Sequence, residues 1–371
     1  MNLRERTAAI RHFQPFDRLP YTCDGIFAST LHRWVKEGLP LDAIPGRKGT
    51  TFPGYTSLDK YFNCDTSIGP SLQLNFNILP PYPSEVLSQD ETTVTVRDGM
   101  GIVSRYFPDQ EDSMHQFLSH PVKNRNDWKD MKKRYQYTAE RLPFNWGKEF
   151  ITELNQSTHP ITVGIEGIYW TPRNWMGAEE QMTMFYDDPD LVCDMMDTLI
   201  DLWIMVLTPV IEQVHIDCIG ISEDMAYKCG SLISPDMFQR FLAPRYRRFV
   251  DFLNAHGVFD ISIDCDGLIH ELIPLYLDCG IHEFGPFEVV CGNDPFYIRR
   301  EYGNQVIICG AFDKMAMAAG RDAIDREWKR LWPLVENGGF FPACDHAVPS
   351  DVSFDNFCYY MQQKRKYIGL E

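Results

Sequence analysis

The sequence predicts an α/β protein, and more specifically a closed (β/α)8 barrel of the TIM type. From Pro160 onward, short apolar runs rich in β-branched residues alternate with longer amphipathic segments, which is typical of strand–helix units in a parallel sheet. Polar residues recur at the C-terminal ends of the predicted strands, where barrels of this type place their active sites. An open doubly wound sheet is the alternative, but neither of the glycine-rich phosphate-binding patterns GxGxxG and GxxxxGK[ST] occurs in the chain.

The composition is that of an ordinary globular protein. The 371 residues are 44% hydrophobic, enough to bury a substantial core, and we expect a single domain spanning residues 1–371. The net charge of −17 disfavours nucleic acid and anionic membranes as partners, because both are negatively charged. The N-terminal segment is charged, unlike a signal peptide, and no apolar run approaches the roughly 20 residues that span a bilayer. A cytoplasmic protein with reduced cysteines is expected.

The N-terminal part of the chain is less regular than the rest. A short helix is predicted before Asp17-Arg18-Leu19-Pro20, forming an N-terminal extension, and a second helix is predicted from Ala28 to Glu37. Residues 41–150 are interpreted as a long decorated connection. Within it, residues 92–106 alternate around an Asp-Gly turn, which predicts a β-hairpin inserted before the parallel repeat.

The repeating part follows in order. Strands are predicted at 161–167, 217–224, 259–267, 282–286 and 306–309 and from Gly339 onward, and helices at 189–214, 234–257, 269–277, 294–303 and 323–336. Pro244 is expected to kink the second of these helices.

Metal-ligand side chains collect at two of the strand ends. Because side chains alternate along a strand, Asp264 and Asp266 are predicted to share one face, with Cys265 on the other. The same rule places Cys344 and His346 together. Mixed N, O and S donors favour zinc, so these two pairs form the predicted metal site, and Asp264 is also a candidate catalytic group. Helix capping by Asp266, and bonding of His346 to Asp345 or a nearby carbonyl, are the structural alternatives.

Other polar residues are predicted to lie near the same end of the sheet. Glu223 and Asp224 end another strand and are candidates for substrate binding or general acid–base catalysis, although they could equally cap a helix or pair with basic residues. Glu288 is a further catalytic candidate or metal ligand. Arg173 and Trp175 could belong to an aromatic lid over the site, whereas aromatic clusters are more often part of a core.

A series of short motifs runs through nearly the whole chain in a characteristic order. They are Leu3-Arg4-Glu5-Arg6 with Asp17-Arg18-Leu19-Pro20, Arg33-Trp34 with Glu37-Gly38-Leu39-Pro40, Ser222–Lys228, Ile233-Ser234-Pro235, Asp264–Gly267, Gly310–Asp313, Gly338–Phe340 and Asp345–Pro349. In these motifs the chain resembles the uroporphyrinogen decarboxylase superfamily, and its corrinoid-linked methyltransferase branch more than the decarboxylases.

The resemblance implies a TIM barrel that transfers a methyl group between a small substrate and a cobalamin held by a separate corrinoid protein. In members that methylate thiols, zinc is bound by His-x-Cys and a later Cys, which fall on Asp264, Asp266 and near Cys344. Two carboxylates make a harder site, which favours an O- or N-bound methyl group over a thiol. Zinc would then act as a Lewis acid on the substrate heteroatom. Tyr227, in a matched motif, and Cys265 complete the candidate substrate-binding residues.

The sequence also allows two functions other than methyl transfer. Decarboxylases of the superfamily carry an arginine-rich segment near the start, but Cys23–Phe27 contains no arginine, so uroporphyrinogen decarboxylation ranks second. The other alternative is a ligand-binding barrel without catalytic activity. A homodimer is one expectation for the assembly.

Overall fold

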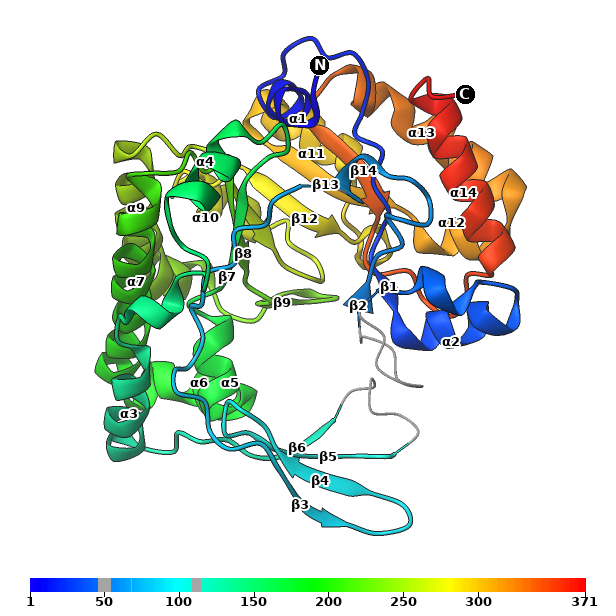
Figure 1. Cartoon of the computed structure of the whole chain (residues 1–371). Coiled ribbons are helices and arrows are strands. Elements are labelled where there is room, and N and C mark those ends of the chain that lie inside the picture. Colours follow the sequence, from blue (N-terminus) through cyan, green and yellow to red (C-terminus); the bar gives the residue numbers. More distant parts are fainter. Residues whose placement is uncertain (46–54, 68, 109–114) are drawn as a thin grey trace.

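A six-stranded parallel sheet forms the centre of the protein, as a computed structural model of the chain shows (Figure 1). The structure describes residues 1–45, 55–67, 69–108 and 115–371. The strand order is β14-β13-β12-β11-β8-β7, so each of these strands lies beside the previous one in the chain, which is the winding of a barrel. Their bounds are β7 (Thr162–Glu166), β8 (Cys218–Ser222), β11 (Ile261–Asp264), β12 (Glu283–Phe287), β13 (Ile307–Phe312) and β14 (Phe340–Cys344).

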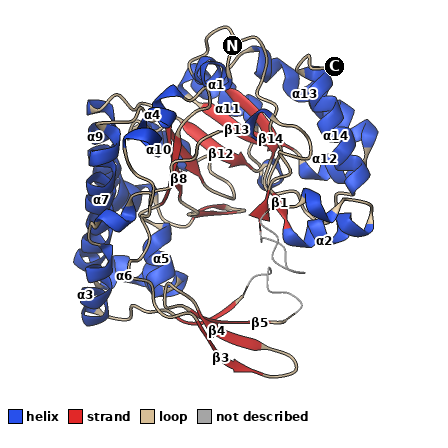
Figure 2. Ribbon diagram, viewed as in Figure 1, coloured by secondary structure: helices blue, strands red, loops and turns tan. Residues whose placement is uncertain are grey.

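Helices connect these strands and cover the outer side of the sheet (Figure 2). Ile219, Ile221, Ile263 and Phe284 are buried on this outer side. The connecting helices are α5 (Trp170–Met176), α6 (Ala178–Asp187), α7 (Pro189–Ile211), α8 (Pro235–Met237), α9 (Ala243–Ala255), α10 (Leu272–Leu277), α11 (Pro295–Tyr302), α12 (Lys314–Ala319) and α13 (Arg321–Glu336), and α14 (Phe354–Tyr367) follows the last strand. The alternation of strands and helices predicted from the sequence is confirmed.

The helix predicted at 234–257 is present but not uniform. Ser234 caps α8 by accepting a hydrogen bond from the Met237 N–H, and a π-helical turn at Phe238–Leu242 precedes α9. Pro244 lies in the first turn of α9, where its missing N–H removes a helical hydrogen bond. The proline therefore coincides with an irregular turn between two helices.

The inner side of the sheet carries small residues where the outer side carries large ones. Gly164, Gly220 and Ser262 lie side by side on three neighbouring strands. One layer further toward the strand ends, Asp264 lies beside Gly285. Small side chains at these positions leave open space in front of the sheet.

The sheet does not close into the predicted eight-stranded barrel within the described residues, where β14 and β7 are its two edges. Strand β1 (Ile26–Phe27) runs parallel to the chain just after β14, but it forms only one bridge there, to Val348. Closer to the end of β14, before this bridge, the Cys344 N–H donates to the Asp24 side chain at 2.7 Å. A carboxylate thus takes the hydrogen bond that the backbone of a barrel strand would accept, so a regular ladder does not form.

A second, antiparallel sheet projects from the body of the protein (Figure 1). It consists of β3 (Glu85–Gln89), β4 (Val94–Arg97), β5 (Val103–Tyr106) and β6 (Gln116–Ser119). Strands β4 and β5 form the hairpin predicted around the Asp-Gly turn. Asp98 stabilises the turn by accepting hydrogen bonds from the N–H groups of Met100 and Ile102.

The remaining elements are short or lie at the periphery. They are α1 (Leu3–Arg11), α2 (Ala28–Lys36), α3 (Arg125–Lys132), α4 (Lys148–Gln156), β2 (Tyr55–Thr56), β9 (Ala226–Tyr227) and β10 (Gly230–Ser231). Strand β2 pairs with β1, and β9 pairs with β10. Both ends of the chain lie near the top of Figure 1. Across the described ranges, no helix combines the length and apolarity needed to cross a membrane.

Candidate active site

A cavity of about 600 Å3 lies against the inner side of the sheet. Residues from β11 to β14 and from the N-terminal stretch 22–25 form its walls. Its volume is in the range of small-molecule binding sites. The charged groups of its described lining are Asp24, Asp264, Asp266 and Glu283, and the lining includes His346 but no lysine or arginine.

Asp266 and His346 form a pair at the strand-end side of this cavity. Nε2 of His346 lies 3.2 Å from Oδ2 of Asp266, and the imidazole stacks on the Phe27 ring with centroids 5.5 Å apart. The hydrogen bond to Asp266 raises the pKa of His346 above its usual value, against the opposing effect of burial. The pair therefore holds its proton more tightly than a free histidine would, and the partner of His346 is Asp266 rather than Asp345 or a carbonyl, which the structural alternative predicted.

Asp264 faces the cavity from the end of β11. No described residue forms a hydrogen bond with its carboxylate, and solvent in the cavity reaches the side chain. Partial burial, with the nearby charge of Asp266, raises the pKa of Asp264 to about 6, and His346 acts in the opposite direction. Asp264 is thus a carboxylate without a bonded partner beside the Asp266–His346 pair.

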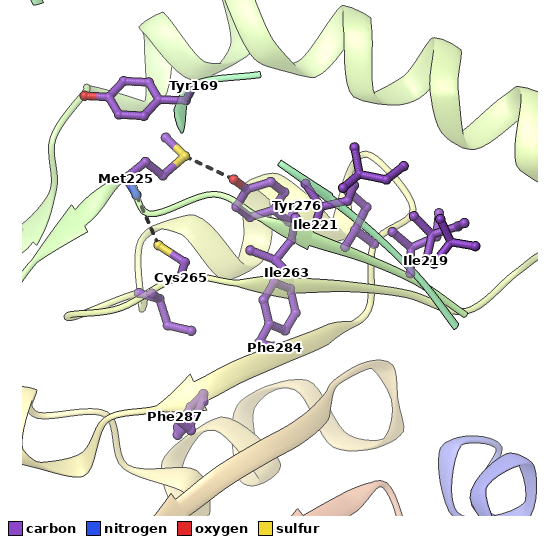
Figure 3. Packing of buried hydrophobic residues seen from close by; sticks show 14 of the residues in the cluster. Tyr169, Ile219, Ile221, Met225, Ile263, Cys265, Tyr276, Phe284 and Phe287 are labelled. Atoms are coloured by element: carbon purple, nitrogen blue, oxygen red, sulfur yellow. Dashed lines mark hydrogen bonds between the residues drawn. The ribbon is translucent and has the colours of Figure 1, made fainter. Parts of the chain in front are cut away.

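Cys265 points away from the cavity, as the alternation along the strand predicted. It is 1% exposed, and its Sγ accepts a hydrogen bond from the Met225 N–H at 3.4 Å (Figure 3). The hydroxyl of Tyr276 lies 3.0 Å from Sδ of the same methionine. Burial also raises the pKa of the Cys265 thiol, and this residue belongs to the core and does not line the cavity.

Cys344 lines the same cavity as Asp264, Asp266 and His346, but its thiol is buried at the end of β14. Strand β14 ends at Cys344 and the chain bends through residues 345–347, so the alternation that would align it with His346 stops. The thiol is buried, and burial raises its pKa, with the carboxylates of Asp24 and Asp345 adding to the shift. The bend is the reason for the difference from the prediction.

The side chains predicted to bind zinc do not form a complete zinc site. All four predicted ligands, Asp264, Asp266, Cys344 and His346, border one cavity, but the described part of the chain contains no group of three or more His, Cys, Asp or Glu side chains arranged to hold a metal ion. A zinc site needs about four converging donors, and a buried neutral thiol is a poor one. The predicted four-ligand set therefore does not fit the structure.

Glu288 lies just outside the cavity in an ion pair. Its Oε1 accepts a hydrogen bond from Nζ of Lys314 at 2.9 Å, and its Oε2 accepts one from the Gly267 N–H at 2.7 Å. Lys314 also lies 3.6 Å from Oδ1 of the buried Asp345. These contacts hold together the loops that follow β11, β12, β13 and β14, which fixes the positions of Asp266 and His346.

Glu223 is fully buried and does not reach the cavity. Its carboxyl accepts hydrogen bonds from the N–H groups of Tyr169 and Trp170, at the start of α5, and from the Tyr246 hydroxyl. Burial raises the pKa of Glu223 to about 7, and the hydrogen bonds oppose this rise. The predicted capping alternative describes its position, and its predicted contact with substrate is not supported by this geometry.

Asp224 and Arg173 form a pair at the end of β8. Nη1 of Arg173 lies 3.2 Å from the Asp224 carboxylate and donates to the Asp224 carbonyl at 2.9 Å. The guanidinium carbon lies 4.7 Å from the centre of the Trp170 ring. Burial raises the pKa of Asp224, and the nearby carboxylates of Asp266 and Glu288 raise it further, whereas Arg173 lowers it. Asp224 and Arg173 therefore lie close enough to these two acids to feel their charge.

Trp175 belongs to the core, which is the alternative that the sequence left open for this aromatic cluster. It is 0% exposed, packs against Trp128 and Tyr135, and donates its indole N–H to the Tyr135 hydroxyl at 3.0 Å. Trp175 lies in α5, and its ring packs beneath α3. A buried ring of this size cannot move freely.

Tyr227 is 58% exposed on the β9–β10 hairpin. Its carbonyl accepts a hydrogen bond from the Leu268 N–H at 3.0 Å. A side chain at Gly267, where φ is +82°, would come within 2.7 Å of the same carbonyl oxygen, so glycine permits this close approach. The hairpin therefore lies against the turn that carries Asp266.

Two acidic residues of the cavity were not among the candidates. They are Asp24, within the segment Cys23–Phe27, and Glu283, within the predicted strand at 282–286. Glu283 is paired with Arg11, whose Nε lies 2.6 Å from Oε2. An acid within an apolar strand requires a partner when buried, which is the signal that could have identified Glu283. Its partner lies in the N-terminal helix, far away in the sequence.

Comparisons with known proteins agree with the fold and the motifs. The uroporphyrinogen decarboxylase (URO-D) family matches residues 94–367. Among solved structures, a methyltransferase from Methanosarcina mazei is similar over 99% of this chain and 98% of that one, with a TM-score of 0.58 and 15% sequence identity, which shows a shared fold. No curated protein sequence matches. The family match covers most of the chain, and the chain therefore belongs to the uroporphyrinogen decarboxylase (URO-D) family.

Proposed function

We propose that this protein is a methyltransferase that moves a methyl group between a small O- or N-methylated substrate and a cobalamin carried by a partner corrinoid protein. Family membership and the near full-length likeness in fold to a methyltransferase support this proposal. The cavity at the C-terminal ends of the strands provides a site of suitable size.

The negative charge of the cavity is the observation that favours methyl transfer over porphyrinogen decarboxylation. A porphyrinogen with carboxylate side chains needs cationic groups to hold it. The described lining instead presents Asp24, Asp264, Asp266 and Glu283, without lysine or arginine. A polyanion would be repelled from such a cavity, whereas a small neutral or cationic methyl donor would not.

The residues of this chain would bind and orient the methyl donor. The small residues Ser262 and Gly285 leave room for it beside Asp264. The Asp266–His346 pair can hold a proton at Nε2 and hydrogen-bond a substrate heteroatom. Zinc, when bound in relatives of this type, would act as a Lewis acid, but the predicted ligand set does not fit here and we assign it no step.

The experiment that tests the proposal is a methyl-transfer assay. The purified protein is incubated with reduced cobalamin, free or on a corrinoid protein, and with a panel of O-methyl and N-methyl donors. The expected result is conversion to methylcobalamin, followed by its absorption spectrum, with at least one donor. If no donor methylates cobalamin while the protein remains folded, the proposal is wrong. Release of carbon dioxide from a porphyrinogen would support the decarboxylase alternative instead.

A further inference from the structure

The cavity contains more negative charge than the protein neutralises. Glu283 is paired with Arg11, and Asp266 is hydrogen-bonded to His346. Asp24 accepts a backbone N–H through one oxygen. Asp264 has no ion-pair partner and no hydrogen-bond donor among the described residues that surround it, and the charge of His346 acts on it only through space. Two of these carboxylates, Asp24 and Asp264, therefore form no ion pair with the described residues. Asp24 is buried and accepts one backbone N–H, so Asp264 is the carboxylate of the pair that is open to a ligand in the cavity.

The surroundings of Asp264 leave room for such a ligand. In the sheet it lies between Ser222 of β8 and Gly285 of β12, both of which have small or no side chains. Its carboxylate opens into the cavity of about 600 Å3. The carboxylate is exposed to the cavity, and the space beside it is large enough for a small organic cation, which it would attract by its charge.

We infer that the methyl-donating substrate is a quaternary ammonium compound whose positive charge is held by Asp264. This inference rests on the proposed methyl transfer and specifies its substrate class.

The chemistry of a quaternary ammonium donor agrees with the groups that the cavity provides. When the bond between the methyl carbon and nitrogen breaks, its electron pair stays on nitrogen and the amine leaves as a neutral molecule. The reduced cobalamin supplies the electron pair of the new bond to the methyl carbon, so charge and electrons balance. An ether would leave as an alkoxide, which needs a proton or a Lewis acid. A neutral amine leaving group requires neither.

Binding to a matched pair of ligands tests the inference without cobalamin. Choline and 3,3-dimethylbutan-1-ol have the same shape, but a carbon atom replaces the charged nitrogen in the second. By isothermal titration calorimetry, we expect choline to bind the wild-type protein about tenfold or more tightly than its uncharged analogue. Asp264→Asn should remove this preference by weakening choline alone, and tetramethylammonium should compete with choline.

Controls separate charge recognition from loss of folding. Asp251→Asn removes one charge from an exposed position on α9 and should leave both affinities unchanged. Thermal unfolding checks that Asp264→Asn is folded, and Asp264→Ser provides a second variant with the same expected loss of choline binding. A titration with zinc chloride shows whether the same carboxylate takes a metal ion.

Each contrary outcome overturns the inference. These outcomes are equal affinity for choline and its analogue, absence of choline and tetramethylammonium binding at millimolar concentrations, and unchanged choline binding in Asp264→Asn. Zinc binding that depends on Asp264, without choline binding, would assign the site to a metal. Failure of the proposed function is distinct from these, because it would appear as cation binding without methyl transfer from any donor.

Discussion

Glu223 shows how a single buried carboxyl links folding to pH. It lies between the start of α5 and the Tyr246 hydroxyl, with no exposure to solvent. Burial raises its pKa to about 7, whereas an unfolded chain would give it the usual value of about 4.3. The folded protein therefore binds this proton more tightly than the unfolded chain does.

The sign of the pH effect follows from this difference. The stabilisation from Glu223 is fully present below about pH 4.3 and is lost as the pH rises through about 7. Glu223→Gln should remove this contribution, which is at most about 4 kcal/mol, so the free energy of unfolding should fall less between pH 5 and 7 than in the wild type. Urea unfolding at a series of pH values measures it.

A matched variant sharpens the test. Tyr246→Phe removes a donor that favours the ionised carboxyl, so the loss of stability should move to higher pH. Identical pH profiles for the wild type and Glu223→Gln would show that Glu223 is not the group responsible.

At the scale of elements, the corner between β7 and α5 depends on one glycine. A Cβ atom at Gly167 would lie 1.9 Å from Oε2 of Glu223, which is far inside van der Waals contact. Gly167→Ala must therefore displace the carboxylate that caps α5. We expect a loss of about 3 kcal/mol or more in the free energy of unfolding, measured from denaturant midpoints.

Strand β7, which ends just before Gly167, offers a control for this substitution. Gly164 lies three residues earlier in β7, and a Cβ atom there would have no heavy atom within 4 Å. Gly164→Ala should change stability by no more than about 1 kcal/mol, because the added methyl group points into open space. Equal losses for the two alanine variants would contradict the packing at the β7–α5 corner.

At the scale of the whole molecule, the Arg11–Glu283 ion pair ties the N-terminal helix to the centre of the sheet. The Arg11 side chain is 10% exposed and that of Glu283 7%, and Cys309 also donates to Glu283. Arg11→Met would leave the Glu283 carboxylate buried without its partner. We expect this variant to lose about 3–5 kcal/mol of stability in chemical unfolding.

A double variant distinguishes the charge from the packing. Arg11→Met with Glu283→Leu removes both charges and should recover part of the loss, since an apolar pair avoids the uncompensated carboxylate. Lys133→Met, which breaks an exposed pair with Asp130, should have a much smaller effect than Arg11→Met. A loss in the double variant as large as in Arg11→Met would assign the effect to packing.

The local elements of the fold could be predicted from the sequence, because their patterns lie within a few residues of one another. The predicted strand at 161–167 contains β7, and the predicted helix at 189–214 contains α7. The alternation along β11 also places Asp264 and Asp266 at the cavity and Cys265 in the core, as the structure shows. These features depend on local periodicity, which the sequence displays directly.

The α/β repeat, the strand ends that carry acids and the motifs of the URO-D family follow from local sequence patterns. Contacts between distant parts of the chain set the open edge of the sheet beside Asp24, the burial of Trp175 and Cys344, and the pairing of Arg11 with Glu283, and they leave Asp264 without a hydrogen-bond partner among the described residues. The physical reason is that these outcomes depend on pairing between residues far apart in the chain and on bends after the strands. Local periodicity contains no information about either.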